Sequence, residues 1–153
     1  MLKYLKKIFS NDTSENREIN RTRKLQISTC ALFIEMAKAD SNFSNEEEEK
    51  IISIMKSLFE LDDEYVNELI ETAKERTEES ISLYEFTTIL NEQFTNDEKY
   101  DVIKNMWRLI FTDNKLDKYE DQLVKRIGGM LNLDFNLIIA AKLEVKKEIE
   151  NQN

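Results

Sequence analysis

The chain has 153 residues, of which 35% are charged and 41% apolar, and its formal net charge at pH 7 is −9. These values are typical of a soluble domain of ordinary size. Histidine and proline are absent, and there is one cysteine. The composition therefore excludes histidine-based catalytic triads, zinc sites built from histidine or from several cysteines, and internal disulfides.

The first residues differ in charge from the rest. Residues 1–24 carry seven basic and three acidic side chains, whereas the remainder carries 15 basic and 28 acidic ones. The acidic body repels phosphate, which argues against nucleic acid as a partner. We expect residues 1–20 to form a flexible basic and polar tail. No apolar run approaches the roughly 20 residues of a membrane span, so we expect no transmembrane segment and a cytoplasmic protein.

Residues 1–9 allow two interpretations. Leu2, Leu5 and Phe9 could share one face of a short helix whose neighbouring lysines contact a membrane surface. Alternatively, so short a segment stays frayed and makes no such contact. The sequence leaves both open.

From residue 21 onward, apolar residues recur with the period of an amphipathic helix. Ile27, Cys30, Ala31 and Ile34 give the first such stripe, at i, i+3, i+4 and i+7. The pattern predicts an all-α fold, a compact seven-helix bundle over residues 21–150, with a disordered end at 151–153. The predicted helices cover 21–39, 45–59, 63–77, 83–93, 96–112, 118–131 and 135–150.

Helix starts carry capping signals. A hydroxyl or carboxylate residue followed three positions later by glutamate is the pattern of a capping box. It occurs at Ser44 with Glu47, Ser82 with Glu85, Thr95 with Glu98 and Asp117 with Glu120, and Asp62 is placed to cap the third helix. In the sixth helix, Gly128 and Gly129 interrupt good helix formers, which indicates a close helix–helix crossing there.

The sequence also repeats itself after 73 residues. This shift places Asp40 on Asp113 and Glu47 on Glu120, each within an acidic loop that joins two helices. If the loops meet across a pseudo-two-fold axis, these four carboxylates could hold a hard cation such as Ca²⁺, Mg²⁺ or Mn²⁺. The alternative is that they only end and cap helices. Neither loop has the ligand spacing of an EF-hand.

Several segments resemble the TerB-like family of tellurite-resistance proteins. They are 29–40, 80–87, 107–120 and 135–142. The resemblance implies a seven-helix bundle and an acidic cluster suspected of binding metal, carried here by Asp40, Glu47, Asp113 and Glu120. It also implies a link to stress responses and to membrane-associated complexes. A related domain precedes the J domain of a membrane-anchored DnaJ-type co-chaperone.

We therefore expect a non-enzymatic helical module that binds a protein partner, membrane-associated or not, with a divalent cation on its acidic face. The alternative is a cation sensor or buffer in which the paired acidic loops are the functional element. Cys30 lies on an apolar stripe with no base available, so we expect it in the core rather than at a reactive site. No catalytic residue is predicted.

Overall fold

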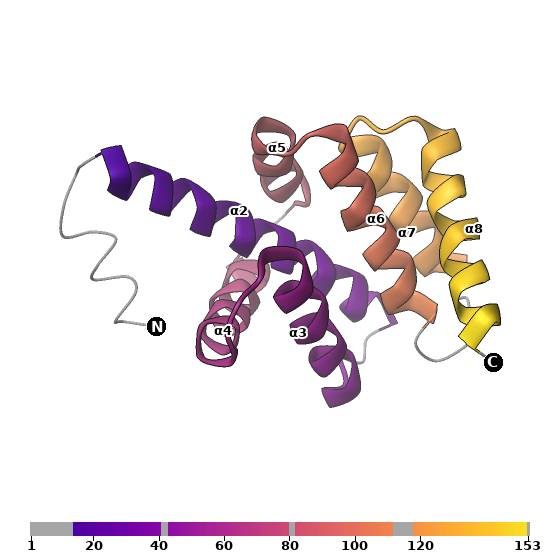
Figure 1. Ribbon diagram of the computed structural model, residues 1–153, viewed down its shortest axis with the longest axis horizontal. Helices are drawn as coiled ribbons and strands as arrows, with labels where there is room; N and C mark the ends of the chain where they lie inside the picture. Colours follow the sequence, from indigo (N-terminus) through magenta and orange to yellow (C-terminus); the bar gives the residue numbers. More distant parts are fainter. Residues whose placement is uncertain (1–13, 41–42, 80–81, 112–117, 153) are drawn as a thin grey trace.

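The computed structural model describes residues 14–40, 43–79, 82–111 and 118–152. Within these ranges the protein is a bundle of seven α-helices with no strand, which confirms the predicted fold class (Figure 1). The elements are α2 (Ser14–Ala37), the short 3₁₀ helix η1 (Lys38–Asp40), α3 (Asn45–Phe59), α4 (Asp63–Glu79), α5 (Tyr84–Gln93), α6 (Asn96–Ile110), α7 (Lys118–Met130) and α8 (Phe135–Gln152).

The first helix is longer than predicted. It begins at Ser14, whereas the apolar pattern placed its start near residue 21. Residues 14–20 contain no glycine or proline, and extending a helix that already exists is far easier than starting one. The N-terminal part of α2 extends beyond the other helices (Figure 1). Residues 1–13, with the proposed membrane contact, lie outside the described residues.

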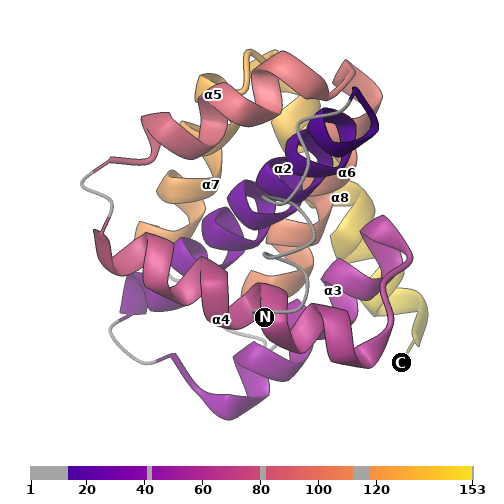
Figure 2. The same ribbon diagram turned by 90° about the vertical axis from the view of Figure 1, so that its left-hand side faces the viewer.

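Helix α2 is the centre of the bundle. It packs against α3, α4, α5, α6 and α7, and Figure 2 shows it running between the surrounding helices. Residues 30–34 are completely buried, because a helix enclosed on several sides needs apolar residues on nearly its whole circumference. The packing of α2 on α6 brings together the two helices that precede the acidic loops.

Helices α6 and α8 are joined by one buried hydrogen bond and a row of ion pairs. The Trp107 indole Nε1 donates to the Ile138 carbonyl oxygen at 3.1 Å. Along the exposed edge, Arg108 Nε donates to Glu148 Oε2 at 3.0 Å, and the Lys104 ammonium lies 3.3 Å from Glu144 Oε1. Ion pairs near the surface contribute little individually, so α8 is held mainly by its buried contacts, which include the Trp107 hydrogen bond and the packing of Ile138, Ala141 and Val145.

Helices α7 and α8 approach closely at Gly128. A Cβ atom at this position would lie 2.5 Å from Ile138 Cδ1, nearer than van der Waals contact allows. At Gly129 an added Cβ would meet no atom within 4 Å. The predicted close crossing is therefore confirmed for Gly128, whereas Gly129 lies on the exposed side of α7.

Two of the predicted capping boxes form. Ser44 caps α3 with Glu47, and Thr95 caps α6 with Glu98. Asp62 Oδ1 accepts from the Tyr65 N–H at 2.8 Å, as expected for the start of α4. The box predicted with Ser82 as N-cap residue is wrong, although the Ser82 hydroxyl accepts from the Tyr84 N–H at 3.0 Å. Helix α5 begins at Tyr84, its N-cap residue Leu83 makes no side-chain cap bond, and Glu85 forms an ion pair with Arg76 of α4. Asp117 lies outside the described residues.

The Thr95 cap gives a direct test of the start of α6. Thr95 Oγ1 accepts from the Glu98 N–H at 3.2 Å, so Thr95→Ala leaves that donor without its partner. We expect a loss of about 0.5–2 kcal/mol in the free energy of unfolding, measured by denaturant titration followed by Trp107 fluorescence. Thr22→Ala, at an exposed position in the middle of α2, is the control and should change stability by less than about 0.5 kcal/mol. Equal effects would show that the hydroxyl of Thr95 does not cap α6.

Among the described helices, none is both long enough and apolar enough to cross a membrane.

Candidate functional site

The first acidic loop starts where α2 passes into η1. The Lys38 ammonium donates to Thr77 Oγ1 at 3.0 Å, which fixes η1 to the end of α4. Asp40 is the last residue of η1. On another side, η1 packs against α7, the helix whose first turn contains Glu120. The backbone at the start of the first loop is thus held beside the helix that follows the second loop.

Glu47 is a cap residue in this structure. Its Oε1 accepts from the Ser44 N–H at 3.3 Å and from the Ser44 hydroxyl at 3.0 Å, and its own N–H donates to Ser44 Oγ at 3.1 Å. The side chain is therefore turned back to the start of α3 and is half-buried. The capping alternative drawn from the sequence holds for this residue, and it does not exclude a further ligand on the carboxylate.

The remaining carboxylates of the predicted cluster are placed as follows. Glu120 is half-buried in the first turn of α7. Asp113 lies outside the described residues, and of Asp40 only the backbone is described. Over the ranges that the structure describes, no group of three or more histidine, cysteine, aspartate or glutamate side chains is placed to hold a metal ion. The four-carboxylate site therefore stays a prediction.

A lysine that the sequence analysis missed lies against this acidic region. The Lys74 ammonium, from α4, pairs with Glu48 in the first turn of α3 and lies 3.1 Å from Glu71 Oε1. It also lies 5.8 Å from the centre of the Phe43 ring. Hydrogen bonding to Glu48 raises the pKa of Lys74, so it stays charged. Lys74 thus neutralises part of the negative charge at the start of α3.

Asp121 is a second carboxylate with cationic neighbours. Its Oδ1 accepts from the Lys142 ammonium of α8 at 2.6 Å, and its Oδ2 lies 2.6 Å from Lys125 Nζ. Burial would raise the pKa of Asp121, but the hydrogen bonds from both lysines outweigh it and hold the pKa below its usual value. Asp121 therefore stays charged and ties α7 to α8.

A comparison with known families gives one match for the chain. The family model described as tellurite resistance protein TerB matches residues 26–143, which is well over half of the chain. The chain belongs to the TerB family. The match runs from within α2 to within α8, so it spans both helix pairs that flank the acidic loops. No curated protein matches the chain, and no solved structure matches it either.

The single thiol of this TerB domain is inert. Cys30 is completely buried in α2, and burial raises the pKa of its thiol to about 12. The thiolate, which is the reactive form, is therefore not populated near neutral pH. The prediction that Cys30 belongs to the core is confirmed.

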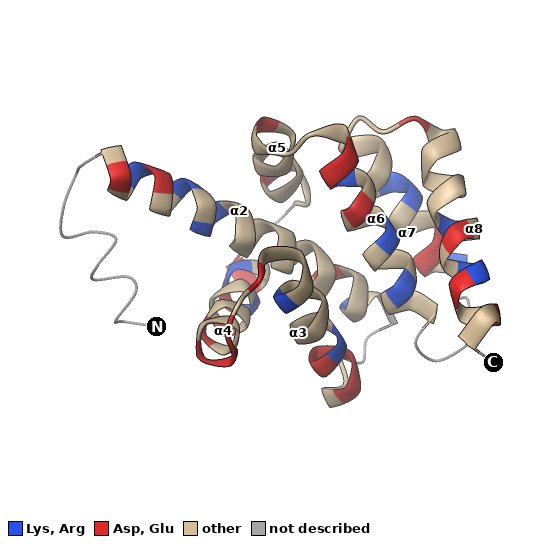
Figure 3. Ribbon diagram, in the orientation of Figure 1, with Lys and Arg blue, Asp and Glu red and all other residues tan. Residues whose placement is uncertain are grey.

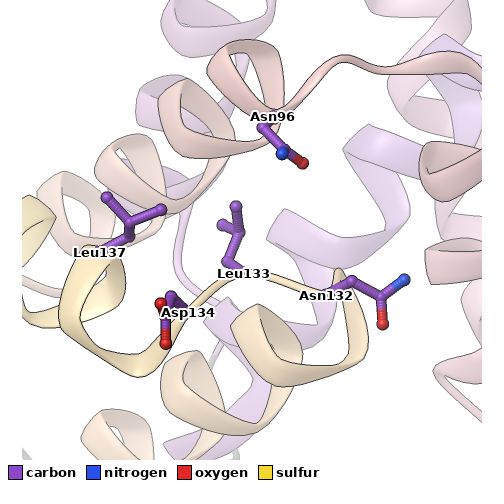
Figure 4. A pocket seen from close by; sticks show the side chains of 5 residues that line it. All are labelled: Asn96, Asn132, Leu133, Asp134 and Leu137. Carbon is purple, nitrogen blue, oxygen red and sulfur yellow. The ribbon is translucent and has the colours of Figure 1, made fainter.

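A shallow pocket of about 580 Å³ lies at one end of the TerB domain, between the start of α6 and the turn that joins α7 to α8. Figure 4 shows the Leu133 side chain rising toward Asn96, with Asp134 and Leu137 beside it. Asn132, which has a positive φ of 62°, forms the turn. The lining offers two amides and a single carboxylate, which is a weak basis for selecting a ligand.

Helix α2 also buries an arginine whose side chain has no hydrogen-bond partner among the described residues. Arg23 of α2 is 4% exposed, and none of its guanidinium nitrogens has a partner among the described residues. The guanidinium lies over the Tyr65 ring, 5.4 Å from its centre. The Tyr65 hydroxyl in turn donates to Gln26 Oε1 at 2.6 Å. A charge buried in this way opposes folding unless something offsets it.

Proposed function

We propose that the chain is a cytoplasmic, non-enzymatic protein-interaction domain of the tellurite-resistance and stress-response type, with a divalent cation bound between its acidic loops. The membership in the TerB family supports the type. The cation site is supported by the packing of η1 against α7. The last residue of η1 is Asp40, and the first turn of α7 contains Glu120. That packing is the arrangement that a site shared by the two loops requires.

The absence of an enzymatic role is inferred from the residue types. There is no histidine to act as a general base near neutral pH. The one thiol is buried and has a pKa near 12, so it is no nucleophile. Binding is the function that remains for a bundle of this kind, with its acidic loops as the charged feature.

The cation gives the first test. The proposed ligands Asp40, Glu47, Asp113 and Glu120 are all carboxylates, which prefer Ca²⁺, Mg²⁺ or Mn²⁺. Because the ion binds only the folded chain, a concentration tenfold above Kd should add about 1.4 kcal/mol to the free energy of unfolding. We expect millimolar Ca²⁺ or Mn²⁺ to raise the melting temperature by a few degrees. The double variant Asp40→Asn/Asp113→Asn should lose this response.

A matched control separates site binding from general screening of negative charge. Glu64→Gln/Asp101→Asn removes two exposed carboxylates from α4 and α6, away from the acidic loops, and should keep the response to the ion. If the wild type and both double variants respond equally, the ion only screens charge. The acidic loops are then caps and turns, and the cation site is wrong.

The interaction role needs a partner test with the intact chain. The chain, immobilised through either end, is used to capture proteins with and without chelator, and each captured protein is then purified and titrated against the chain. Saturable binding of a purified partner supports the proposal, and loss of that binding with chelator links it to the cation. If no purified candidate binds, the interaction role is wrong.

The second candidate is a cation sensor or buffer. It is favoured by the acidic first turn of α3, where Glu46, Glu47 and Glu48 follow one another at the positive end of the helix dipole. A sensor would bind the ion in the absence of any partner and would change conformation on binding. Calcium titration followed by circular dichroism and Trp107 fluorescence distinguishes the two, since a purely structural ion raises stability without changing either signal in the folded state.

A further inference from the structure

Resting on the proposed interaction role, we infer that the outer side of the α7–α8 hairpin is the docking surface for an acidic amphipathic helix of the partner. We call this surface the α7–α8 face. It is made of Lys125, Gly129, Phe135, Ile139, Leu143 and Lys146. Neither the family match nor the proposed cation site assigns this face a role.

The α7–α8 face has an apolar stripe on α8. Phe135, Ile139 and Leu143 follow one another at intervals of four residues, so they lie in a row along one side of the helix. Phe135 is 57% exposed and Leu143 is 59% exposed, and Ile139 between them is half-buried. Large apolar side chains exposed in a row, rather than singly, are the feature that marks an interaction site.

The contacts of two lysines show which side of α8 carries the stripe. Lys125 of α7 lies 5.9 Å from the centre of the Phe135 ring. One helical turn before Lys146, Lys142 reaches across to Asp121 of α7. The stripe therefore runs along the seam between α7 and α8. On α7, one turn after Lys125, Gly129 has no side chain and is exposed, and an added Cβ there would meet no atom within 4 Å, so the surface of α7 is open at this point.

The charge around the seam is positive in a protein that is negative overall. The described exposed residues of α7 include no acidic side chain; they are Lys118, Tyr119, Gln122, Arg126 and Gly129. From Phe135 to Leu143 the only charged residue of α8 is Lys142, and Figure 3 shows the first turns of α8 without charged residues. Asp121 is nearly buried between Lys125 and Lys142. Two exposed carboxylates adjoin the stripe in sequence: Asp134, which precedes Phe135, and Glu144, which pairs with Lys104 of α6.

The apolar stripe and the lysines around it indicate what kind of partner would bind the α7–α8 face. An apolar row flanked by lysines fits a helix with apolar anchors at i, i+4 and i+7 and with glutamate or aspartate on either side of them. The stripe from Phe135 to Leu143 spans about 12 Å at 1.5 Å per residue, which matches two to three turns of a partner helix. The remaining acidic surface of the domain would repel such a helix and so favour this one orientation.

The test uses a fluorescein-labelled synthetic helix with leucine on one face and glutamate on the flanks, titrated with the full chain at low ionic strength. A peptide with lysine in place of every glutamate is the charge control. We expect saturable binding of the acidic peptide, weakened as salt is added, and at least tenfold weaker binding of the lysine peptide. Equal binding of both peptides, or binding of neither, would overturn the inference.

Single variants locate the binding. Leu143→Ser and Lys146→Glu should each weaken acidic-peptide binding at least tenfold. Leu137→Ser, on the same helix but on its α6 side and 42% exposed, and Lys24→Glu on α2 are the matched controls and should leave binding unchanged. These positions are at the surface, and circular dichroism checks that each variant is folded. Controls that weaken binding as much as the test variants would place the peptide elsewhere.

The outcome also separates this inference from the proposed function. If a purified natural partner binds the chain and Leu143→Ser and Lys146→Glu leave that binding unchanged, the interaction role stands and the α7–α8 face is wrong. Vesicles with 30% phosphatidylserine serve as the competing occupant. If they bind the chain, lose binding with the same two variants, and the acidic peptide does not bind, the face contacts an anionic membrane and the inference of a partner helix fails.

Discussion

Replacing Arg23 with methionine is expected to stabilise the protein, by about 1–4 kcal/mol in the free energy of unfolding. The Arg23 guanidinium is buried, and none of its nitrogens has a hydrogen-bond partner among the described residues. The cation–π contact of the guanidinium with the Tyr65 ring stabilises the folded state by only about 0.5–2 kcal/mol. Methionine keeps the length and flexibility of the side chain and removes the charge.

The measurement is chemical denaturation of the wild type and the variant under identical conditions. Arg21→Met is the matched control because Arg21 is exposed on the same helix, and its effect should stay within about 0.5 kcal/mol. A loss of stability in Arg23→Met of more than 1 kcal/mol would mean that the guanidinium has a counter-charge that the described contacts do not include.

Gly128→Ala is expected to lower the free energy of unfolding, although alanine is the better helix former. The gain in helix propensity is at most about 1 kcal/mol. Against it, the new methyl group would lie 2.5 Å from Ile138 Cδ1 and 2.7 Å from Ile138 Cγ1. Ile138 is itself 1% exposed, so it has little space into which to turn. Overpacking of this kind costs about 1–3 kcal/mol.

Gly129→Ala is the natural control, since the two glycines are neighbours in the same helix. It gains the helix propensity without the clash and should raise stability by up to about 1 kcal/mol. In an Ile138→Ala background, which removes both clashing atoms, the penalty of Gly128→Ala should disappear, and the resulting coupling energy identifies the clash. If the two glycine variants behave alike, α7 and α8 do not meet at Gly128 as closely as described.

The sequence predicts the helices well because their apolar spacing is a local property. One boundary prediction and one capping prediction failed for reasons that lie outside the local pattern. The apolar stripe of the first helix begins near Ile27, but the helix itself continues back to Ser14 through polar residues that carry no such stripe. At Ser82 the capping pattern is present, but Glu85 pairs with Arg76 of another helix, and α5 starts at Tyr84.

The surroundings of the candidate site were less predictable, because they depend on which helix faces meet. Lys74 lies far from Glu48 in sequence, and only the packing of α4 on α3 joins them. The burial of Arg23 could have been predicted from the sequence. Arg23 lies four residues before Ile27 and seven before Cys30, on the buried stripe of α2. The exposed apolar row of α8, Phe135, Ile139 and Leu143, could also have been predicted, because α8 contains more apolar residues than one buried face needs.

The central position of α2 has a consequence for amide hydrogen exchange. An amide exchanges when local opening exposes it, and a segment enclosed by its neighbours opens only when they separate. The amides of residues 30–34 lie where α2 is completely buried, in the helix that packs against α3, α4, α5, α6 and α7. They should therefore exchange only through global unfolding, and their exchange rates should report the stability of the whole protein. The amides of residues 17–20, beyond the bundle, should exchange orders of magnitude faster within the same helix.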